Sequence, residues 1–512
     1  MKKFLINDSL WETRIAITRD GQLQNVYFDT HTTNRLERSY FKGLVTKILP
    51  GIQTAFVDIG QERSGFLHIS EIDRELASSR MTTSYEEEEG EEFEEDEERS
   101  KPQVPRRDLD INKILKEGEF VLVEVSKEPI YEKGAKLSTC FTLPGRYLVL
   151  MPNIPRIGIS KKIGSYEERT RLRELLKANL PEGMGAIIRT TAGAGSEREV
   201  LRDLKYLVNQ WNEIQKRYQG AAGVEKVYED IDLTLQIIRD NLDHDVEAIL
   251  CDSKRSEGHI LKFIKENAPE HSHKVQLYEG HPALFDKYDI EKQVEQALQS
   301  RVALKSGGSI IVETTEAMTV IDVNTSRYTG SGGSGMEETI LKTNLEAADE
   351  IVRQLRLRNI GGLIVIDFID MASNNNRQKL FRHLEKTLRE RDKFQSVVLR
   401  VSEFGLVQMT RKRSGKTLIQ QLTATCLCCG GMGFVKSVQS EAHSILRKVR
   451  EELSAGKLSG NITVAVHEQI FGYLINTEYN AILSLEKEFR SKITLAIHDT
   501  TRLNVFTAKA AK

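Results

Sequence analysis

The sequence predicts a multidomain protein of mixed α/β and α+β class, and three observations lead to this prediction. The chain has 512 residues, of which 39% are hydrophobic, and this length allows about three domains at roughly 150 residues per domain. Short apolar stretches separated by Pro-Gly and Gly-Gln occupy residues 43–69, as in a small β-barrel. Between residues 224 and 413, strand-like and helical stretches alternate, which is typical of an α/β protein.

An acidic insertion interrupts the predicted barrel. Apolar strands are predicted at four places, residues 43–49, 54–59, 65–69 and 120–125. Between the third and the fourth lies the run 86–98, which contains eleven carboxylates. A segment so poor in apolar residues cannot bury a core. We therefore expect residues 79–107 to form a disordered surface insertion in one loop of an OB-fold.

The charge of the remaining residues favours a polyanionic partner. The formal net charge is −2, and without the eleven carboxylates of residues 86–98 it becomes +9. A basic body attracts nucleic acid, although a modest excess over a large protein is also typical of ordinary solvation. No apolar run approaches the roughly 20 residues that cross a bilayer. The five cysteines do not form a disulfide framework, so we expect a reducing, cytoplasmic location.

Further strands and helices are predicted after the barrel. Strands are expected at 147–151 and 184–188, and Ser196 with Glu199 forms a capping-box pattern that opens a helix. The apolar positions of this helix are Val200, Leu204, Leu207, Val208 and Trp211. The last unit, from residue 438 to residue 512, is predicted to alternate two amphipathic helices with strands at 462–466 and 493–497.

The most informative stretch is a predicted β-α-β unit whose two strands both carry aspartate. Residues 318–324 form a short apolar strand that includes Asp322 and Asn324. A helix follows, and residues 363–367 form a second apolar strand that ends in Asp367. Strands joined in this way are normally parallel, and adjacent strands lie about 4.8 Å apart. We therefore expect Asp322 and Asp367 to lie side by side at one edge of the sheet.

Two carboxylates at that separation repel each other unless a cation lies between them. Hard oxygen ligands without a nearby His or Cys favour Mg²⁺ or Mn²⁺, which can activate water for attack on phosphorus. Asn324 points to the same strand face as Asp322 and can donate a hydrogen bond to a phosphate. The alternative is that each aspartate caps a turn or a helix.

The cysteine cluster resembles half of a zinc site. In the stretch Cys426-Leu-Cys-Cys429, followed by glycines, a Cys-x-x-Cys turn points two thiolates at one metal. Structural zinc needs four ligands, so the simplest completion is the same pair from a second protomer. The alternative, given equal weight, is a buried or redox-active thiol cluster.

A basic stretch precedes the cysteines. Residues 409–413 include three cations, Arg411, Lys412 and Arg413. They either face RNA phosphates or form a solvated strand end.

Five segments, in this order, resemble the bacterial ribonuclease E/G family. They are TAFVDIG at 54–60, YLVLMPN at 147–153, NLEAADE at 344–350, GGLIVIDFIDM at 361–371 and FGLVQMTRKR at 404–413. The resemblance runs over nearly the whole chain. It implies a single-strand-specific endoribonuclease that prefers A/U-rich RNA, leaves 5′-phosphate and 3′-hydroxyl ends, and acts in messenger decay and ribosomal RNA maturation.

The resemblance also implies roles for individual residues. Asp322 and Asp367 match the family's Mg²⁺-binding aspartates, and Asn324 matches the amide that orients the scissile phosphate. RNA contacts are implied for Phe56, Phe66 and Lys133, although without the resemblance both phenylalanines would be taken for barrel core. A pocket that senses a 5′-monophosphate is implied for Gly145, Val149, Arg189 and Thr190, since a guanidinium fork and a hydroxyl suit a terminal phosphate.

The implied architecture divides the chain into six parts. They are an RNase H-like subdomain split between 1–38 and 222–280, an OB-fold at 39–128, a 5′-sensor at 129–221, a DNase I-like catalytic subdomain at 281–420, a zinc link at 421–436 and a small α/β domain at 437–512. Members of the family work as dimers or dimers of dimers, and the zinc link implies a site shared between protomers.

The sequence departs from the family pattern at two places. Leu427 stands where the family usually has proline, and Cys428 is an extra thiol; we favour Cys426 and Cys429 as the zinc ligands. The acidic insertion is not part of the common pattern, and it either mimics phosphate or, as we favour, is a solvated loop.

The absence of a long scaffold after the small domain makes the chain resemble the ribonuclease G branch of the family.

Two other functions remain open. A noncatalytic RNA-binding protein of the same architecture is the alternative function. A phosphohydrolase of small molecules is disfavoured, because it would not need a basic barrel with stacking aromatics.

Overall fold

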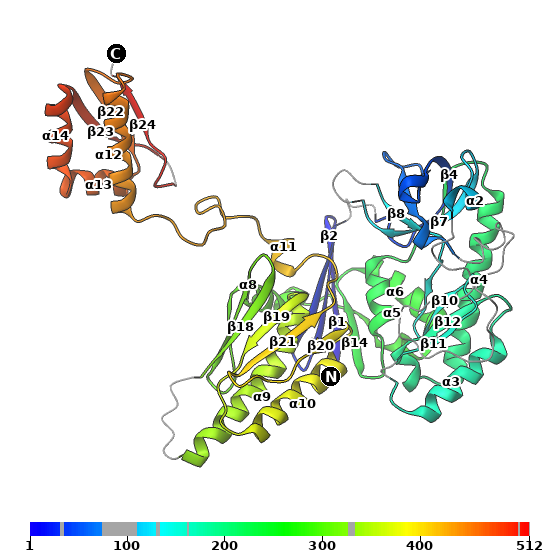
Figure 1. Cartoon of the computed structure of the whole chain (residues 1–512). Coiled ribbons are helices and arrows are strands. Elements are labelled where there is room, and N and C mark those ends of the chain that lie inside the picture. Colours follow the sequence, from blue (N-terminus) through cyan, green and yellow to red (C-terminus); the bar gives the residue numbers. More distant parts are fainter. Residues whose placement is uncertain are drawn as a thin grey trace. The chain divides into compact units, whose positions relative to one another are not determined.

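The computed structural model describes most of the chain in two compact units. Residues 1–30, 35–73, 110–129, 134–160, 163–325, 333–499 and 502–510 are described. The first unit contains Met1–Leu418 and the second Ile419–Lys512, and each is taken separately below (Figure 1). The expected acidic insertion at 79–107 lies outside the described residues. No helix in the described ranges is long and apolar enough to cross a membrane.

A closed five-stranded barrel forms part of the first unit. Its strands are β4 (Tyr40–Leu49), β5 (Thr54–Asp58), β6 (Gly65–His68), β7 (Phe120–Lys127) and β8 (Lys136–Ser138). They follow the order β4-β5-β6-β8-β7, and β7 pairs back onto β4 to close the barrel. Val45, Val57, Leu67 and Val123 fill its interior. The predicted small barrel and its four strands are confirmed, and α2 (Ile111–Ile114) with the 3₁₀ turns Pro50–Ile52 and Ile69–Glu71 completes this part.

A four-stranded sheet with two long helices follows the barrel. Its order is β11 (Ile157–Ile159), β12 (Gly185–Ile188), β10 (Leu148–Met151) and β9 (Leu143–Pro144). The helices are α3 (Tyr166–Asn179) and α4 (Glu197–Gly220). Ser196 and Glu199 form the predicted capping box at the start of α4. The buried face of α4 includes Val200, Leu204, Leu207 and Trp211, while Val208 is only partly buried.

Segments far apart in the sequence share the next sheet. Its order is β15 (Val275–Leu277), β14 (Val246–Cys251), β1 (Lys2–Asp8), β2 (Glu12–Arg19) and β3 (Gln22–Thr30). β13 (Glu225–Tyr228) instead pairs with β4 of the barrel. The helices here are α5 (Leu233–Asn241) and α6 (Lys254–Asn267). The predicted subdomain boundaries, and the RNase H-like and DNase I-like assignments, stay predictions.

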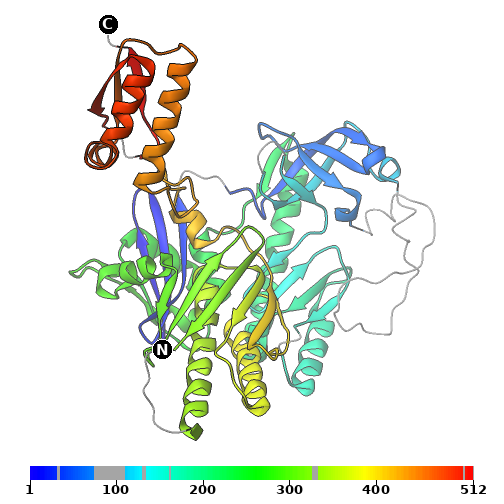
Figure 2. The same ribbon diagram turned by 60° about the vertical axis from the view of Figure 1, so that its left-hand side comes forward.

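The predicted β-α-β unit lies in a six-stranded mixed sheet. Its order is β16 (Arg301–Ala303), β17 (Ser309–Thr314), β18 (Met318–Asn324), β19 (Gly362–Asp367), β21 (Leu406–Arg411) and β20 (Ser396–Val398). The helices α9 (Gly333–Leu357) and α10 (Asn374–Arg391) pack side by side along this sheet (Figures 1 and 2). Two shorter helices, α7 (Leu284–Lys287) and α8 (Ile290–Leu298), precede it. β18 and β19 are adjacent and parallel, as predicted.

The second unit is a small α/β domain with one more helix than predicted. Its sheet has the order β23 (Lys492–Ile497), β22 (Asn461–Val466) and β24 (Thr507–Ala510). The helices are α12 (Val438–Ser454), α13 (Glu468–Asn476) and α14 (Tyr479–Phe489), and α11 (Leu418–Leu422) lies at the division between the units. The prediction of two helices was wrong because α13 ends at Asn476, with Thr477 as its C-cap, and the apolar pattern resumes at once in α14.

Candidate functional site

Asp322 and Asp367 are paired neighbours on β18 and β19. The register of the two parallel strands sets Ile321 beside Ile366 and Asp322 beside Asp367. Side chains alternate between the faces of a sheet. Both isoleucines are fully buried in the core formed with α9 and α10, so the two aspartates lie on the opposite face. There Asp322 is half-buried and Asp367 is exposed.

The electrostatics of this pair suit a hard divalent cation. Burial raises the pKa of Asp367 above its ordinary value, and the negative charges of Asp322 and Asp370 raise it further. The Nδ2 atom of Asn324 donates to Oδ2 of Asp322 at 2.6 Å. Among the residues that the structure describes, no third His, Cys, Asp or Glu joins the pair in a metal-binding group. Two carboxylates and open coordination positions fit Mg²⁺, which keeps several waters as ligands.

Asn344, which the sequence prediction did not single out, holds the chain beyond Asp367. This residue of α9 is fully buried. Its Nδ2 donates to the carbonyl oxygen of Ile369 at 2.9 Å, and its Oδ1 accepts from the amide of Ile369 at 3.1 Å. The available signal was a polar residue within the apolar face of the helix. The two hydrogen bonds fix the backbone two residues after Asp367.

Gly405 closes the same turn from the other side. It has a φ of +74°, and an added Cβ would lie 2.6 Å from the carbonyl oxygen of Phe368 and 3.0 Å from Oδ1 of Asp370. The close approach and the positive φ both require glycine. The residues after β19 are therefore confined between α9 and the loop before β21.

The basic stretch at 409–413 divides into a structural and an exposed part. Arg411 is buried, and its Nε and Nη2 atoms contact the two carboxylate oxygens of Asp392 at 2.6 and 3.0 Å. Its Nη1 atom donates to the carbonyl oxygen of Ile360. Both predicted roles were wrong for Arg411, because its carboxylate partner lies nineteen residues earlier and is brought close only by the fold. Lys412 and Arg413 are exposed.

Phe56 and Phe66 lie on the outside of the barrel. They are directly paired across β5 and β6. Their strand neighbours Ala55, Val57 and Leu67 are buried inside, whereas both phenylalanines are half-buried. The alternative of barrel-core phenylalanines is therefore wrong. Lys133, the third predicted RNA contact, lies outside the described residues.

The structure brings Gly145 and Arg189 together at one end of β10 and β12. The backbone amide of Arg189 donates to the carbonyl oxygen of Tyr147, and its Nη1 atom donates to the carbonyl oxygen of Gly145 at 2.6 Å. Val149 pairs with Ile187 across the two strands. Thr190 follows Arg189 at the start of the 3₁₀ turn Thr190–Ala194, and its hydroxyl lies 3.0 Å from that of Ser160.

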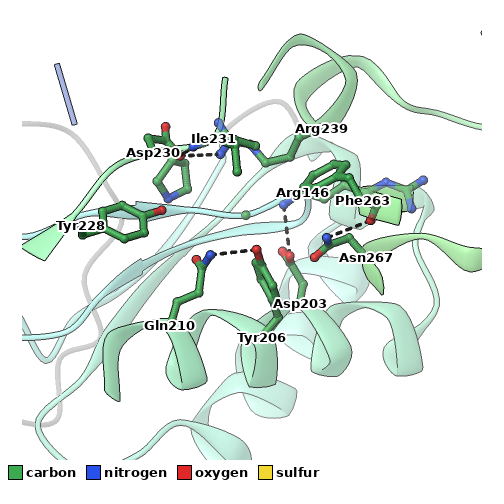
Figure 3. Close-up of a pocket in the computed structure, with 12 residues that line it drawn as sticks. Arg146, Asp203, Tyr206, Gln210, Tyr228, Asp230, Ile231, Arg239, Phe263 and Asn267 are labelled. Atoms are coloured by element: carbon green, nitrogen blue, oxygen red, sulfur yellow. Dashed lines mark hydrogen bonds and ion pairs between the residues drawn. The ribbon is translucent and has the colours of Figure 1, made fainter. Parts of the chain in front are cut away.

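The side chain of Asp203, on α4, holds the turn before β10 through backbone hydrogen bonds. Its carboxylate accepts from the backbone amides of Arg146, Tyr147 and Leu148 at 3.2, 2.8 and 3.2 Å. Figure 3 shows the first of these contacts, between Arg146 and Asp203. A Cβ at Gly145 would lie 2.5 Å from Oδ2 of Asp203, so only glycine fits there. Burial raises the pKa of Asp203, although the three backbone hydrogen bonds oppose the shift.

A small polar cavity lies beside the turn. Figure 3 shows Arg146 and Asp203 on its wall together with Asp230 and Arg239. The cavity volume of about 20 Å³ is enough for about one water molecule. Within the described ranges, Oδ2 of Asp230 and Nη2 of Arg239 have no hydrogen-bond partner, although Nη1 of Arg38 lies 3.7 Å from Oδ2 of Asp230. The cavity is too small for a nucleotide.

The cysteine cluster belongs to the second unit and is accessible. Cys426 and Cys428 are exposed and Cys429 is half-buried, so the buried-thiol alternative is wrong. The thiol of Cys426 accepts hydrogen bonds from the backbone amides of Cys429 and Cys428, which lowers its pKa. Sγ of Cys429 accepts from the amide of Gly433 at 3.4 Å. Amide hydrogen bonds to thiolates in a tight turn are compatible with the predicted half of a zinc site, which stays a prediction.

Comparison with known proteins identifies the family. The model of the "Ribonuclease E/G family" matches residues 142–414, and that of the "RNase E/G, Thioredoxin-like domain" matches residues 425–510. The chain is 36% identical to Ribonuclease G of Haemophilus influenzae over 490 residues, which are 96% of this chain and 95% of that protein. It is 36% identical to Ribonuclease G of Escherichia coli, with 87% of each chain covered.

Ribonuclease E of Escherichia coli is also 36% identical, but only 44% of its length is covered. The predicted resemblance to the family, including its ribonuclease G branch, is confirmed. The family match, the closed barrel and the paired aspartates agree, and the second unit is a thioredoxin-like domain. This chain belongs to the ribonuclease E/G family.

Proposed function

We propose that this protein is a Mg²⁺-dependent endoribonuclease that cuts single-stranded, A/U-rich RNA and leaves 5′-phosphate and 3′-hydroxyl ends. The pairing of Asp322 with Asp367 is the observation that supports the proposal most directly. The name Ribonuclease G of its relatives agrees with this activity. We assign its substrates, ribosomal RNA precursors and messenger RNA in the cytoplasm, from the family resemblance.

Asp322 and Asp367 would hold the metal ion between them. When bound, Mg²⁺ polarises a phosphoryl oxygen and makes a coordinated water a better nucleophile. Asn324 donates its amide hydrogen to Asp322, which fixes that carboxylate, and its position at the strand end allows it to orient the scissile phosphate. Asn344 and Gly405 keep the backbone after Asp367 in place.

The paired phenylalanines of the barrel would bind unpaired bases. Phe56 and Phe66 are half-buried on its outer face, where flat aromatic rings can stack on bases of any sequence. We assign the same function to Lys133 from the resemblance. Double-stranded RNA keeps its bases stacked on each other, so this platform favours single strands.

The turn around Arg189 would bind the 5′ end of the RNA. The guanidinium of Arg189 and the hydroxyl of Thr190 can donate hydrogen bonds to a terminal monophosphate, and Gly145 and Val149 would line the site. We propose that 5′-monophosphorylated RNA is therefore preferred over RNA with a 5′-hydroxyl.

Two copies of the chain would share one zinc ion. Cys426 and Cys429 provide two thiols in one turn, and the same pair from a partner completes four ligands. We propose a homodimer, or a dimer of dimers, joined in this way.

Cleavage of a 5′-monophosphorylated, A/U-rich oligonucleotide with Mg²⁺ tests the catalytic assignment. Asp322→Asn and Asp367→Asn are each expected to lower the rate on the order of 100-fold or more while RNA binding persists. Glu313→Gln, which removes an exposed carboxylate of β17, is the matched control and should cut normally.

The same assay separates the alternatives. RNA binding by the wild type without cleavage in Mg²⁺ or Mn²⁺ would establish a noncatalytic RNA-binding protein instead. Normal cleavage by both aspartate variants would place the chemistry elsewhere.

A further inference from the structure

The arginine of the 5′-end turn has a carboxylate partner from a different part of the fold. Nη1 of Arg189 donates to Oδ1 of Asp240 at 2.7 Å, as well as to the carbonyl oxygen of Gly145. Asp240 lies near the end of α5. Among the described residues, none accepts a hydrogen bond from Nε or Nη2 of Arg189. One nitrogen of the guanidinium is thus fixed, and the edge formed by the other two remains for a ligand.

A second arginine holds the same carboxylate. Nε of Arg239 donates to Oδ1 of Asp240 at 3.1 Å, and Nη1 of Arg239 lies 3.6 Å from Asp230. Arg239 is 7% exposed and lines the cavity in Figure 3. Burial alone would raise the pKa of Asp240, but the charges of Arg239 and Arg189 outweigh it and lower the pKa below its ordinary value. Asp240 is therefore ionised at neutral pH.

The end of α5 is held at three consecutive carbonyl groups by three basic side chains. The carbonyl oxygen of Asp240 accepts from Nζ of Lys393, that of Asn241 from Nζ of Lys2 and that of Leu242 from Nε of Arg146. Cations are favourable at a helix C-terminus because they meet unpaired carbonyls and the negative end of the helix dipole.

These basic side chains come from separate parts of the first unit. Lys2 lies on β1 and Arg146 in the turn before β10, while Lys393 follows Asp392, the buried partner of Arg411 on β21. The backbone at the end of α5, including Asp240, is consequently fixed from several directions.

We propose that Asp240 is the positioning residue of the 5′-end pocket: it orients Arg189 so that the free guanidinium edge meets a terminal monophosphate. The inference rests on the proposed function of Arg189 and adds a specificity-determining residue to it. A planar guanidinium makes two parallel hydrogen bonds to phosphate only when its plane is correctly oriented. Asp240 contacts a single nitrogen and leaves that paired edge open, so its carboxylate orients the arginine instead of competing with the ligand.

The test compares two RNA oligonucleotides of one sequence, one with a 5′-monophosphate and one with a 5′-hydroxyl. Equilibrium binding without divalent metal and kcat/KM with Mg²⁺ are measured for the wild type, Asp240→Asn, Asp240→Glu and Arg189→Gln. Asp240→Asn keeps the carbonyl that Lys393 contacts and removes only the side-chain charge. Asp245→Asn, which disrupts an exposed ion pair with Arg19, is the matched control.

We expect Asp240→Asn to reduce the preference for the 5′-monophosphate by about tenfold, because it loses a charged hydrogen bond to Arg189. Activity on the 5′-hydroxyl oligonucleotide should change by less than about twofold, which a merely structural role would not allow. Asp240→Glu should retain part of the preference. Combining Asp240→Asn with Arg189→Gln should cause no loss beyond that of Arg189→Gln alone, because the two residues act as a unit.

Three other outcomes would overturn the inference. A stronger preference in Asp240→Asn would show that the carboxylate competes with phosphate. An equal loss on both oligonucleotides would show a role in folding only. Equal binding of both oligonucleotides by the wild type would refute the 5′-end function of Arg189 itself. This outcome is distinguishable from a failure of the inference on Asp240 alone, because it is seen in the wild type without any variant.

Discussion

Asp322 and Asp367 occupy matching positions on two adjacent parallel strands, on the face of the sheet that α9 and α10 do not cover. The residues that set their position lie behind and beside them. Asn344, Gly405 and the Arg411–Asp392 pair fix the strands and turns on which the aspartates stand. The predictions below test these supporting contacts and the remaining sites.

Asn344→Ala is expected to destabilise the protein and to slow cleavage. The substitution leaves the half-buried amide and carbonyl of Ile369 without the side chain that pairs with them, at a cost of roughly 2 kcal/mol in the free energy of unfolding. Thermal unfolding and kcat on a single-stranded RNA would measure both effects. Asn374→Ala, an exposed amide at the start of α10, should change neither; unaltered kcat in Asn344→Ala would remove Asn344 from the positioning of Asp367.

Gly405→Ala should lower activity more than a comparable glycine substitution. The new Cβ would lie 2.6 Å from the carbonyl oxygen of Phe368, so the turn after Asp367 must shift. Gly415→Ala is the control, because Gly415 has a similar φ of +67° but no atom within 4 Å of the added Cβ. Each should lose about 1 kcal/mol of stability from the positive φ. Equal cleavage rates for the two variants would contradict the role of Gly405.

Arg411→Met should unfold the protein more readily, whereas Lys412→Met should weaken RNA binding. The first change removes the arginine that pairs with the buried carboxylate of Asp392, which costs roughly 3–5 kcal/mol. The second removes an exposed cation and should reduce the dependence of RNA affinity on salt. Chemical denaturation would measure the stability of Arg411→Met, and binding titrations at several salt concentrations would measure the RNA affinity of Lys412→Met. An Arg411→Met variant as stable as the wild type would show that the buried pair contributes little.

Because the pKa of Glu124 is raised, we expect the free energy of unfolding of the first unit to fall as pH rises. Burial raises its pKa to about 7, although hydrogen bonds from the amide and hydroxyl of Thr142 oppose the shift. The folded protein therefore binds this proton more tightly than the unfolded chain. The resulting stabilisation is complete below the unfolded pKa of about 4.5 and is lost as pH rises through about 7.

Thermal unfolding between pH 5 and pH 8 would measure this effect. The titration of Glu124 can change the free energy of unfolding by at most roughly 3 kcal/mol over this range. Glu124→Gln should remove most of this pH dependence and should be more stable than the wild type at pH 8. Glu62→Gln, at an exposed position, should behave like the wild type. A wild-type profile that is flat over this range would show that Glu124 titrates normally.

Cys426→Ser and Cys429→Ser are each expected to abolish zinc binding and dimerisation, while Cys428→Ser should preserve both. The first two remove the thiols whose positions suit one metal ion, and the third removes the exposed extra thiol. Zinc content per chain, expected near one-half, and molar mass by light scattering would report the outcome. Loss of zinc in Cys428→Ser would reverse the assignment.

Local patterns in the sequence were sufficient for much of the fold. Short apolar stretches separated by Pro-Gly and Gly-Gln predicted the strands of the barrel, and a capping box predicted the start of α4. The break between α13 and α14 was missed because a short turn at Thr477 does not interrupt the apolar pattern.

The sequence by itself determined the β-α-β unit and the pairing of Asp322 with Asp367, because chain connectivity restricts how two such strands can pack. Only the tertiary structure decided that Arg411 is buried, that Phe56 and Phe66 lie outside the barrel, and that Asp240 contacts Arg189. Each of these depends on side chains from distant segments, or on which face of a strand becomes the interior. Local periodicity does not record which surfaces meet when the chain folds.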